Sequence, residues 1–209
     1  MIRHILFDLD CTLYSSRYGL EEKVLERMWQ YLAQYLRISV EEAEAERNKR
    51  AGKYGTTLEW IMTEEGFTNI DDYMEKVHPA DEADTLPPDP ELRVFLESLP
   101  CPSSILTNSP GFHADRIIRK LGLEGIFIRT FDIEYNGYRG KPHASAYHRA
   151  LEALELPPEE VVFIDDVKRY VDAYLALGGR GILLDEKDAY TDYPHARIKE
   201  LRQLTQFLY

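Results

Sequence analysis

The sequence predicts an α/β protein in which a parallel β-sheet carries helices on both faces and an all-helical segment follows the first strand. Two observations lead to this fold class. From residue 85 onward, short apolar runs alternate with helical patterns, and alternating strands and helices form parallel sheets with right-handed crossovers. Residues 15–84, in contrast, show helical periodicity and no convincing strand. We therefore expect a core domain of residues 1–14 and 85–209 and a helical domain of residues 15–84.

Local signals support the individual elements. Ile5–Leu9 is a short apolar run bounded by polar residues, which is typical of a buried parallel strand. Ser39 and Glu42 form a capping-box pattern that begins a helix, and Asp89-Pro90 combines an N-cap with Pro at the first helical position. Apolar residues from Leu20 to Leu36 recur near helical spacing. The remaining helices are expected over Thr57–Glu65, Asp71–His78, Glu91–Leu99, Phe112–Leu121, His143–Leu156, Arg169–Leu177 and Ile198–Leu208, and the remaining strands over Ser104–Leu106, Ile126–Phe131, Val161–Ile164 and Gly181–Leu184.

The charge of the chain argues against one class of partner. The 209 residues include 25 Lys and Arg against 37 Asp and Glu, for a formal net charge of −12. A protein that follows a nucleic-acid backbone needs a basic face, so we expect no nucleic-acid polymer as a partner. A small anionic ligand remains compatible with this charge, because salt screens distant charges and a bound cation reverses the local sign.

No apolar run is long enough to cross a bilayer, and no leader segment precedes the first expected strand. Cys11 and Cys101 form neither a metal-binding pattern nor a disulfide framework. We therefore expect a cytoplasmic protein with no membrane partner. The oligomeric state does not follow from the sequence, and a monomer and a homodimer both remain open.

Polar residues gather where the expected strands end. They are Asp8, Asp10, Thr12, Thr107, Asn108, Lys141, Asp165 and Asp166. Ligands of parallel α/β sheets bind beyond the carboxyl ends of the strands, so we expect these residues to share one crevice. Carboxylates a few ångströms apart repel one another by about 1–4 kcal/mol per pair unless a cation lies among them. Hard oxygen donors without a His or Cys partner favour Mg²⁺ as that cation.

These residues resemble the motifs of the haloacid-dehalogenase superfamily of phosphohydrolases. The first motif, DxDx[T/V], is matched by Asp8-Leu9-Asp10-Cys11-Thr12, and the second, a Ser or Thr at a strand end, by Thr107-Asn108. Lys141-Pro142 matches the third motif, and Asp165-Asp166 matches the acidic pair of the fourth. The resemblance implies a Rossmann-like, doubly wound parallel sheet with residues 15–84 inserted as a helical cap domain.

A narrower resemblance is to the pyrimidine 5′-nucleotidase branch of that superfamily. It rests on Phe7–Tyr14, Tyr54–Thr57 and Gly140–His143. Members of the branch commonly follow the acidic pair with Ser and, three residues on, Asn. Val167-Lys168-Arg169 stands at that place here, so the surroundings of the metal are expected to differ.

The resemblance implies a Mg²⁺-dependent phosphomonoester hydrolase that works through an aspartyl-phosphate. Asp8 is expected to be the nucleophile, and Asp10 to protonate the leaving oxygen and then activate water. Lys141 is expected to pair with the nucleophile and the transferring phosphoryl group. The expected metal ligands are Asp8, Asp10, and Asp165 or Asp166, and the expected phosphate ligands are Thr107, Asn108 and Lys141.

The substrate favoured by the resemblance is a nucleoside 5′-monophosphate of the pyrimidine type. Arg50, Tyr54 and Thr56 are expected to meet its leaving group; the equally weighted alternative is a solvated basic helix face. A sugar-phosphate or other small-metabolite phosphatase, and a phosphomutase, share the same motifs.

A phospho-accepting, receiver-like switch is the non-enzyme alternative, but its acidic pair precedes the phosphorylated Asp, whereas here the pair comes last. The six histidines show no ligand spacing and are interpreted as surface or packing residues.

Overall fold

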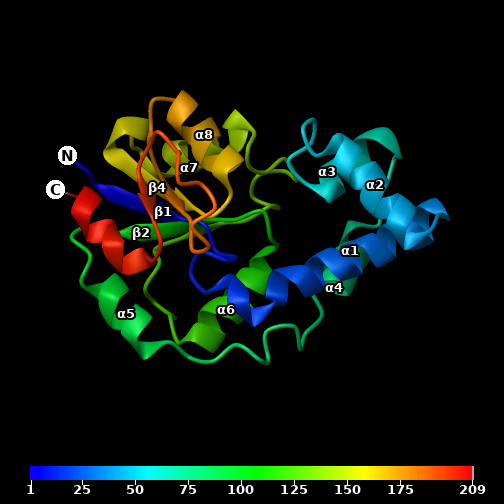
Figure 1. Ribbon diagram of the computed structural model, residues 1–209, viewed down its shortest axis with the longest axis horizontal. Coiled ribbons are helices and arrows are strands. Elements are labelled where there is room, and N and C mark those ends of the chain that lie inside the picture. The colour runs from blue at the N-terminus through cyan, green and yellow to red at the C-terminus, as the bar shows by residue number, and fades with distance from the viewer. Residues whose placement is uncertain (209) are drawn as a thin grey trace. The chain divides into compact units, whose positions relative to one another are not determined.

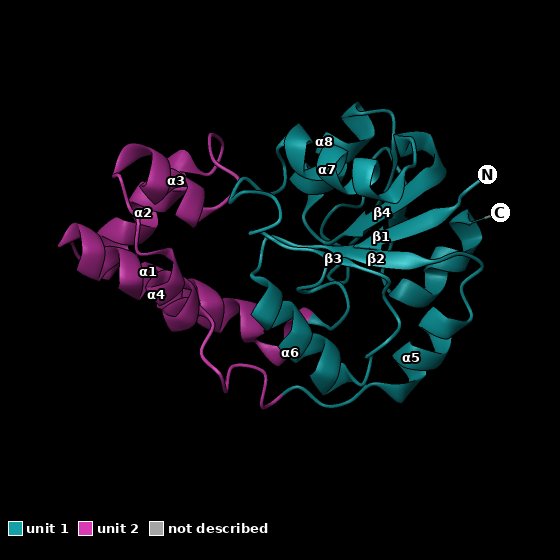
Figure 2. Ribbon diagram, turned by 180° about the vertical axis from the view of Figure 1, so that it is seen from behind, with its two compact units in different colours: residues 1–15, 86–209 teal, residues 16–85 magenta. Residues whose placement is uncertain are grey.

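The computed structural model describes residues 1–208, which form two compact units (Figure 2). Met1–Ser15 and Leu86–Tyr209 make up the first, which we call the sheet unit. Ser16–Thr85 makes up the second, which we call the helical unit. No helix within residues 1–208 is both long and apolar enough to cross a membrane.

The sheet unit contains six parallel strands in the order β3-β2-β1-β4-β5-β6. Their bounds are β1 His4–Phe7, β2 Ser103–Leu106, β3 Thr130–Phe131, β4 Val161–Asp165, β5 Arg180–Leu184 and β6 Arg197–Ile198. From β1 the chain builds the sheet outward through β2 on one side, and later through β4 on the other. The strand order therefore reverses beside β1, and this reversal point is where α/β sheets of this kind bind ligands.

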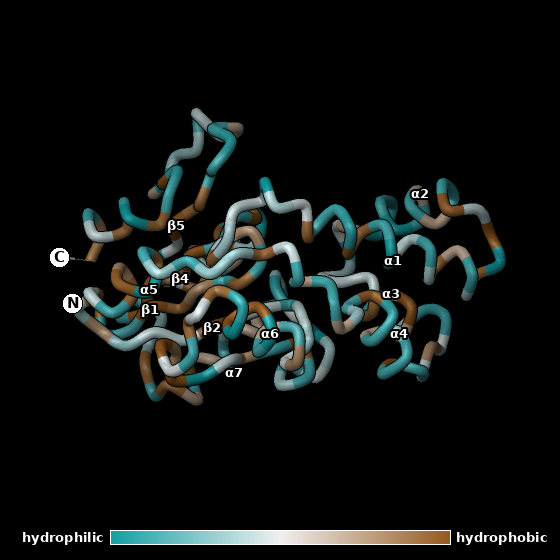
Figure 3. Tube along the Cα trace, turned by 90° about the horizontal axis from the view of Figure 1, so that it is seen from below, coloured by the Kyte–Doolittle hydropathy of each residue, from teal (hydrophilic) through white to brown (hydrophobic). Residues whose placement is uncertain are grey.

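Helices cover both faces of this sheet. Figure 1 shows α5 (Pro90–Glu97) and α6 (Gly111–Leu121) on one side of the strands, and α7 (Ala144–Leu154) and α8 (Lys168–Ala176) on the other. Every residue of β1, β2 and β4 is buried, and the hydropathy colouring in Figure 3 places much of the apolar sequence along the strands. The parallel fold class expected from the sequence is confirmed.

Aromatic rings fill the core on the α7–α8 face. The Tyr147 and Phe163 rings meet edge-on with centroids 5.5 Å apart, and the Phe163 and Tyr174 rings with centroids 5.4 Å apart. The Tyr147 hydroxyl is satisfied by the Tyr170 carbonyl oxygen at 2.8 Å. This packing fixes α7 and α8 against β4, and so fixes the carboxyl end of β4 on which the site depends.

The helical unit consists of α1 (Leu20–Leu36), α2 (Val40–Arg50), α3 (Thr57–Glu64) and α4 (Ile70–Val77). The capping box expected before α2 is confirmed, because the Ser39 side chain accepts from the Glu42 N–H while the Glu42 carboxylate accepts from the Ser39 N–H. In the core of this unit, the Tyr31 ring meets the Tyr73 ring edge-on at 5.1 Å.

Two elements differ from the expectations. The expected strand Ile126–Phe131 is reduced to β3, because the Ile126 N–H bonds to the Leu123 carbonyl in a turn and the chain pairs regularly with β2 only at its last two residues. The expected helix Ile198–Leu208 is instead β6 followed by a 3₁₀ helix over Leu201–Phe207, since Ile198 pairs with Leu184 at the edge of the sheet. The other expected elements are present, with ends shifted by no more than two residues.

Candidate active site

The residues expected to form the site lie at the carboxyl ends of three neighbouring strands. Asp8 directly follows β1, Thr107 directly follows β2, and Asp165 is the last residue of β4. Sheet pairing still holds their backbones, since the Asp8 N–H donates to the Ile164 carbonyl at 2.8 Å and the Thr107 N–H to the Phe131 carbonyl at 3.0 Å. Because the strands are parallel, one edge of the sheet presents all three.

Lys141 joins two of these carboxylates. Its ammonium Nζ donates to Asp8 Oδ1 at 2.5 Å and to Asp165 Oδ2 at 2.6 Å, and its side chain is 1% exposed. Burial raises the pKa of Asp8 to about 7 against the pull of Lys141, and burial also raises the pKa of Asp165. Although burial favours a neutral amine, the two carboxylates raise the pKa of Lys141 above its usual value. One fixed positive charge is thus shared by two buried acids.

The Asn108 side chain holds the backbone of Lys141. Its Oδ1 accepts from the Lys141 N–H at 2.8 Å, and its Nδ2 donates to the Lys141 carbonyl at 2.9 Å. Gly140 leaves room for this contact, because a Cβ there would lie 2.1 Å from Asn108 Oδ1. The buried Thr107 hydroxyl accepts from the Ser109 N–H at 3.0 Å. Thr107 and Asn108, two of the three residues expected to bind phosphate, therefore also shape the loops at the strand ends.

Asp10 is oriented by three donors. Its Oδ1 accepts from the Tyr14 hydroxyl at 2.6 Å and lies 2.7 Å from His113 Nε2, while its Oδ2 accepts from the Ser109 hydroxyl at 2.6 Å. Burial alone would raise the pKa of Asp10, but His113, Ser109 and Tyr14 together hold it well below its usual range. Three side chains therefore hold Asp10 in a fixed orientation, in the loop that carries Asp8.

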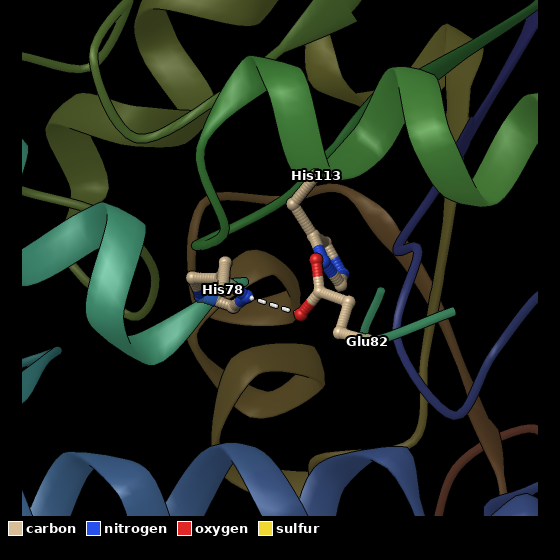
Figure 4. Close-up of side chains that lie close together, drawn as sticks. All are labelled: His78, Glu82 and His113. Carbon is tan, nitrogen blue, oxygen red and sulfur yellow. Dashed lines mark hydrogen bonds and ion pairs between the residues drawn. The ribbon is translucent and has the colours of Figure 1, made fainter. Parts of the chain in front are cut away.

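The interpretation of the histidines as surface or packing residues missed the contact between His113 and Asp10. His113 projects from the first turn of α6 and is 1% exposed (Figure 4). Within the helical unit, His78 also has an ionic partner, with its Nδ1 3.0 Å from the Glu82 carboxylate (Figure 4). The available signal for His113 was its place in the helix that follows β2, whose first turn begins at the carboxyl edge of the sheet.

Three carboxylates form a group suited to a cation. Asp8, Asp165 and Asp166 each offer an oxygen, and these oxygens lie within 4.8 Å of one another. Lys141 is the ammonium bonded to this group and balances only part of its charge. Hard oxygen donors with surplus negative charge fit a divalent ion such as Mg²⁺. The Asp10 carboxylate is outside this group, so the expectation that Asp10 is a metal ligand stays a prediction.

Val167-Lys168-Arg169, the residues after the acidic pair that differ from the nucleotidase branch, place a cationic side chain beside the site. The Val167 N–H donates to Asp165 Oδ1 at 2.7 Å, at the start of α8. The Arg169 guanidinium lies over the Tyr170 ring at 4.9 Å and donates to its hydroxyl at 3.0 Å. Its charge lowers the pKa of Asp165, in opposition to the larger effect of burial. The sequence difference thus adds positive charge near β4.

The three residues expected to contact the leaving group lie in the helical unit, where each has a local partner. Arg50 pairs with Glu64 at 2.7 Å and lies over the Trp60 ring at 4.4 Å. The Tyr54 hydroxyl donates to Glu64 at 2.8 Å, and the Thr56 side chain caps α3. The basic groups of this surface are therefore largely neutralised by acidic neighbours.

Comparisons with known proteins agree with this geometry. Residues 2–173 match the model of the family described as haloacid dehalogenase-like hydrolase. A segment of 75 residues is 33% identical to enolase-phosphatase E1 of Xylella fastidiosa (strain 9a5c), which covers 36% of this chain and 30% of that relative.

Two solved structures share the fold over nearly the whole chain. L-2-haloacid dehalogenase from Xanthobacter autotrophicus superimposes with a TM-score of 0.64 at 18% identity, covering 99% of this chain and 98% of the other. A HAD phosphatase from Thermococcus onnurineus superimposes with a TM-score of 0.63 at 20% identity, with the same coverage. Together with the family match, the strand-end carboxylates and their shared lysine show that the chain belongs to the haloacid dehalogenase-like hydrolases.

Proposed function

We propose that this hydrolase is a Mg²⁺-dependent phosphomonoesterase that forms an aspartyl-phosphate on Asp8. The observation that carries the proposal is the second carboxylate, Asp10, which three donors hold in the loop that carries Asp8. A halide leaves carbon without a proton, whereas an alcohol leaving phosphorus needs one. A fixed acid–base group beside the nucleophile therefore favours phosphate ester cleavage over dehalogenation.

The proposed reaction has two steps. Asp8 attacks phosphorus while the bond to the leaving oxygen breaks, and that oxygen takes a proton from Asp10. Water then attacks phosphorus and gives a proton to Asp10, while the bond to Asp8 breaks and phosphate is released. Asp8, Asp10 and either Asp165 or Asp166 would hold a divalent cation, whose charge would let a carboxylate approach an anionic ester.

The ammonium of Lys141 has a second role in this proposal. Its Nζ lies 2.5 Å from Asp8 Oδ1 and orients the nucleophile. As a point charge, the same ammonium attracts the oxygens of the transferring phosphoryl group. The hydroxyl of Thr107 and the backbone N–H groups near Asn108 are proposed to hold the remaining phosphate oxygens.

The proposed substrate is a nucleoside 5′-monophosphate, with the pyrimidine type favoured. This choice rests on the residues that resemble the nucleotidase branch, with Arg50, Tyr54 and Thr56 of the helical unit as proposed contacts to the leaving group. Sugar phosphates and other small phosphomonoesters are the second candidate, and transfer to a sugar acceptor in place of water is the third.

Phosphate release from a panel of nucleoside monophosphates and sugar phosphates tests the proposal. We expect release in Mg²⁺, loss of release in EDTA, and no release by Asp8→Asn. Asp172→Asn removes a partly exposed carboxylate that pairs with Lys168 on α8 and should leave the rate unchanged. Halide release from a 2-haloacid by the same preparation, without phosphate release from any ester, would instead identify a dehalogenase.

A further inference from the structure

We propose that His113 and Tyr14 are positioning residues that occupy one oxygen of Asp10, Oδ1, and thereby assign the transferable proton to the other oxygen, Oδ2. The inference rests on the proposed function, since it specifies how Asp10 would exchange a proton with the leaving oxygen and with water. The two residues act on Asp10 and need no contact with the substrate.

The hydrogen bonds of Asp10 distinguish its two oxygens. A carboxylate has about four lone-pair positions, two on each oxygen. Tyr14 and His113 take both positions of Oδ1, whereas Ser109 takes one position of Oδ2. No other side-chain hydrogen bond to Asp10 is found within residues 1–208, so one position of Oδ2 stays open.

Protonation of the two oxygens has different consequences. A proton at the open position of Oδ2 leaves all three hydrogen bonds in place. A proton on Oδ1 would displace Tyr14 or His113, both of which are buried, and would leave a buried donor without its acceptor. Oδ2 is therefore the oxygen that can gain and lose a proton while all three hydrogen bonds stay in place.

The exposure of Asp10 also differs from that of His113 and Tyr14. The Asp10 side chain is 27% exposed, whereas His113 is 1% exposed and Tyr14 is 6% exposed. A reacting oxygen can thus reach Asp10 but not the donors behind it. This arrangement is typical of a group that reacts while its neighbours hold it in place.

Three separate segments fix the orientation of the carboxylate. Tyr14 belongs to the loop after β1, Ser109 to the loop after β2, and His113 to α6. Exchange of Oδ1 and Oδ2 by rotation of the side chain would break all three hydrogen bonds at once. The same oxygen therefore serves both steps: Oδ2 gives its proton to the leaving oxygen and regains one from the attacking water, while His113 and Tyr14 keep theirs.

The test compares two phosphate esters in variants of His113. An alkyl phosphate needs a proton on its leaving oxygen, whereas 4-nitrophenyl phosphate releases a stable phenolate without one. We expect His113→Leu to lower kcat for the alkyl ester about 10- to 100-fold more than for the aryl ester, with KM little changed. His113→Gln should recover most of this difference, because its carboxamide N–H can replace Nε2–H.

Tyr14→Phe provides a second variant that keeps the ring and removes only the other donor to Oδ1. The same preference for the aryl ester is expected, and it keeps the inference testable if His113→Leu does not fold. The matched control is His4→Leu, which removes another buried histidine of the sheet unit, one that contacts Ser104 in the neighbouring strand. We expect His4→Leu to affect both esters equally.

Equal losses on both esters in His113→Leu and Tyr14→Phe would show a packing role only and would overturn the inference. A crystal structure of His113→Leu, or of Tyr14→Phe, gives a readout independent of turnover: we expect the Asp10 carboxylate to rotate, and an unchanged carboxylate refutes the positioning role. If the wild-type protein cleaves neither ester, the proposed function fails, and the carboxylate orientation still decides whether these residues position Asp10.

Discussion

Replacement of the proposed nucleophile is expected to stabilise the metal-free protein. Burial raises the pKa of Asp8 from 3.8 to about 7, and the negative charges of Asp165 and Asp10 add to this effect while Lys141 opposes it. A carboxyl whose pKa is higher in the folded state contributes most stability at low pH, and this contribution is lost as the pH rises from 3.8 to about 7. The ionised form therefore destabilises the fold near neutral pH, and Asp8→Asn removes that form.

The magnitude follows from the shift. At about 1.4 kcal/mol per pKa unit, the free energy of unfolding should rise by up to about 4 kcal/mol at about pH 8. Lys141 keeps its contact with Asp165 in the variant, and the Thr12 hydroxyl, which now donates to Asp8 Oδ2 at 3.1 Å, can accept from the new amide. The gain should shrink towards acidic pH, where Asp8 of the wild type is protonated in the folded state.

Urea unfolding in EDTA, at about pH 5 and about pH 8, measures the free energy of unfolding of the wild type and of Asp8→Asn at each pH. Asp185→Asn is a control of opposite sign, because the N–H groups of Ala189 and Tyr190 and the Arg197 side chain outweigh burial and lower the pKa of Asp185. That variant should lose stability at both pH values. A lower free energy of unfolding for Asp8→Asn at about pH 8, with Asp185→Asn behaving as expected, would refute this account of the site.

Two further predictions concern Gly140, which lies against Asn108, and the buried His4 of β1. Gly140→Ala places a Cβ 2.1 Å from Asn108 Oδ1, so it should lower the free energy of unfolding by about 1–3 kcal/mol and slow phosphate release. The control is Gly52→Ala, which should do neither, because a Cβ at residue 52 meets no atom within 4 Å. Equal effects of the two substitutions would contradict the proposed contact. Burial lowers the pKa of His4 from 6.5 to about 4, so stability should fall by up to about 3 kcal/mol as the pH drops through that range, and His4→Gln should remove this part of the loss in urea titrations. Parallel pH curves for wild type and His4→Gln would be the contrary result.

Several parts of the structure were predictable from the sequence because they depend on neighbours in the chain. The capping box at Ser39 and the N-cap at Asp89 each join groups three residues apart. The buried strands β1 and β4 were recognisable as apolar runs, and the parallel sheet followed from their alternation with helices. The strand-end position of Asp8 followed from the same pattern.

The tertiary structure alone decided which distant groups meet. His113 contacts Asp10 although 103 residues separate them in the chain, and Asn108 bonds to the backbone of Lys141 although 33 residues separate them. Both contacts depend on strand register and helix orientation, which no local sequence pattern encodes. Edge pairing likewise shortened the strand expected at Ile126–Phe131 and turned Arg197–Ile198 into β6. Periodicity records which face of an element is buried, whereas the hydrogen-bond partner of a buried polar group depends on what the completed fold brings beside it.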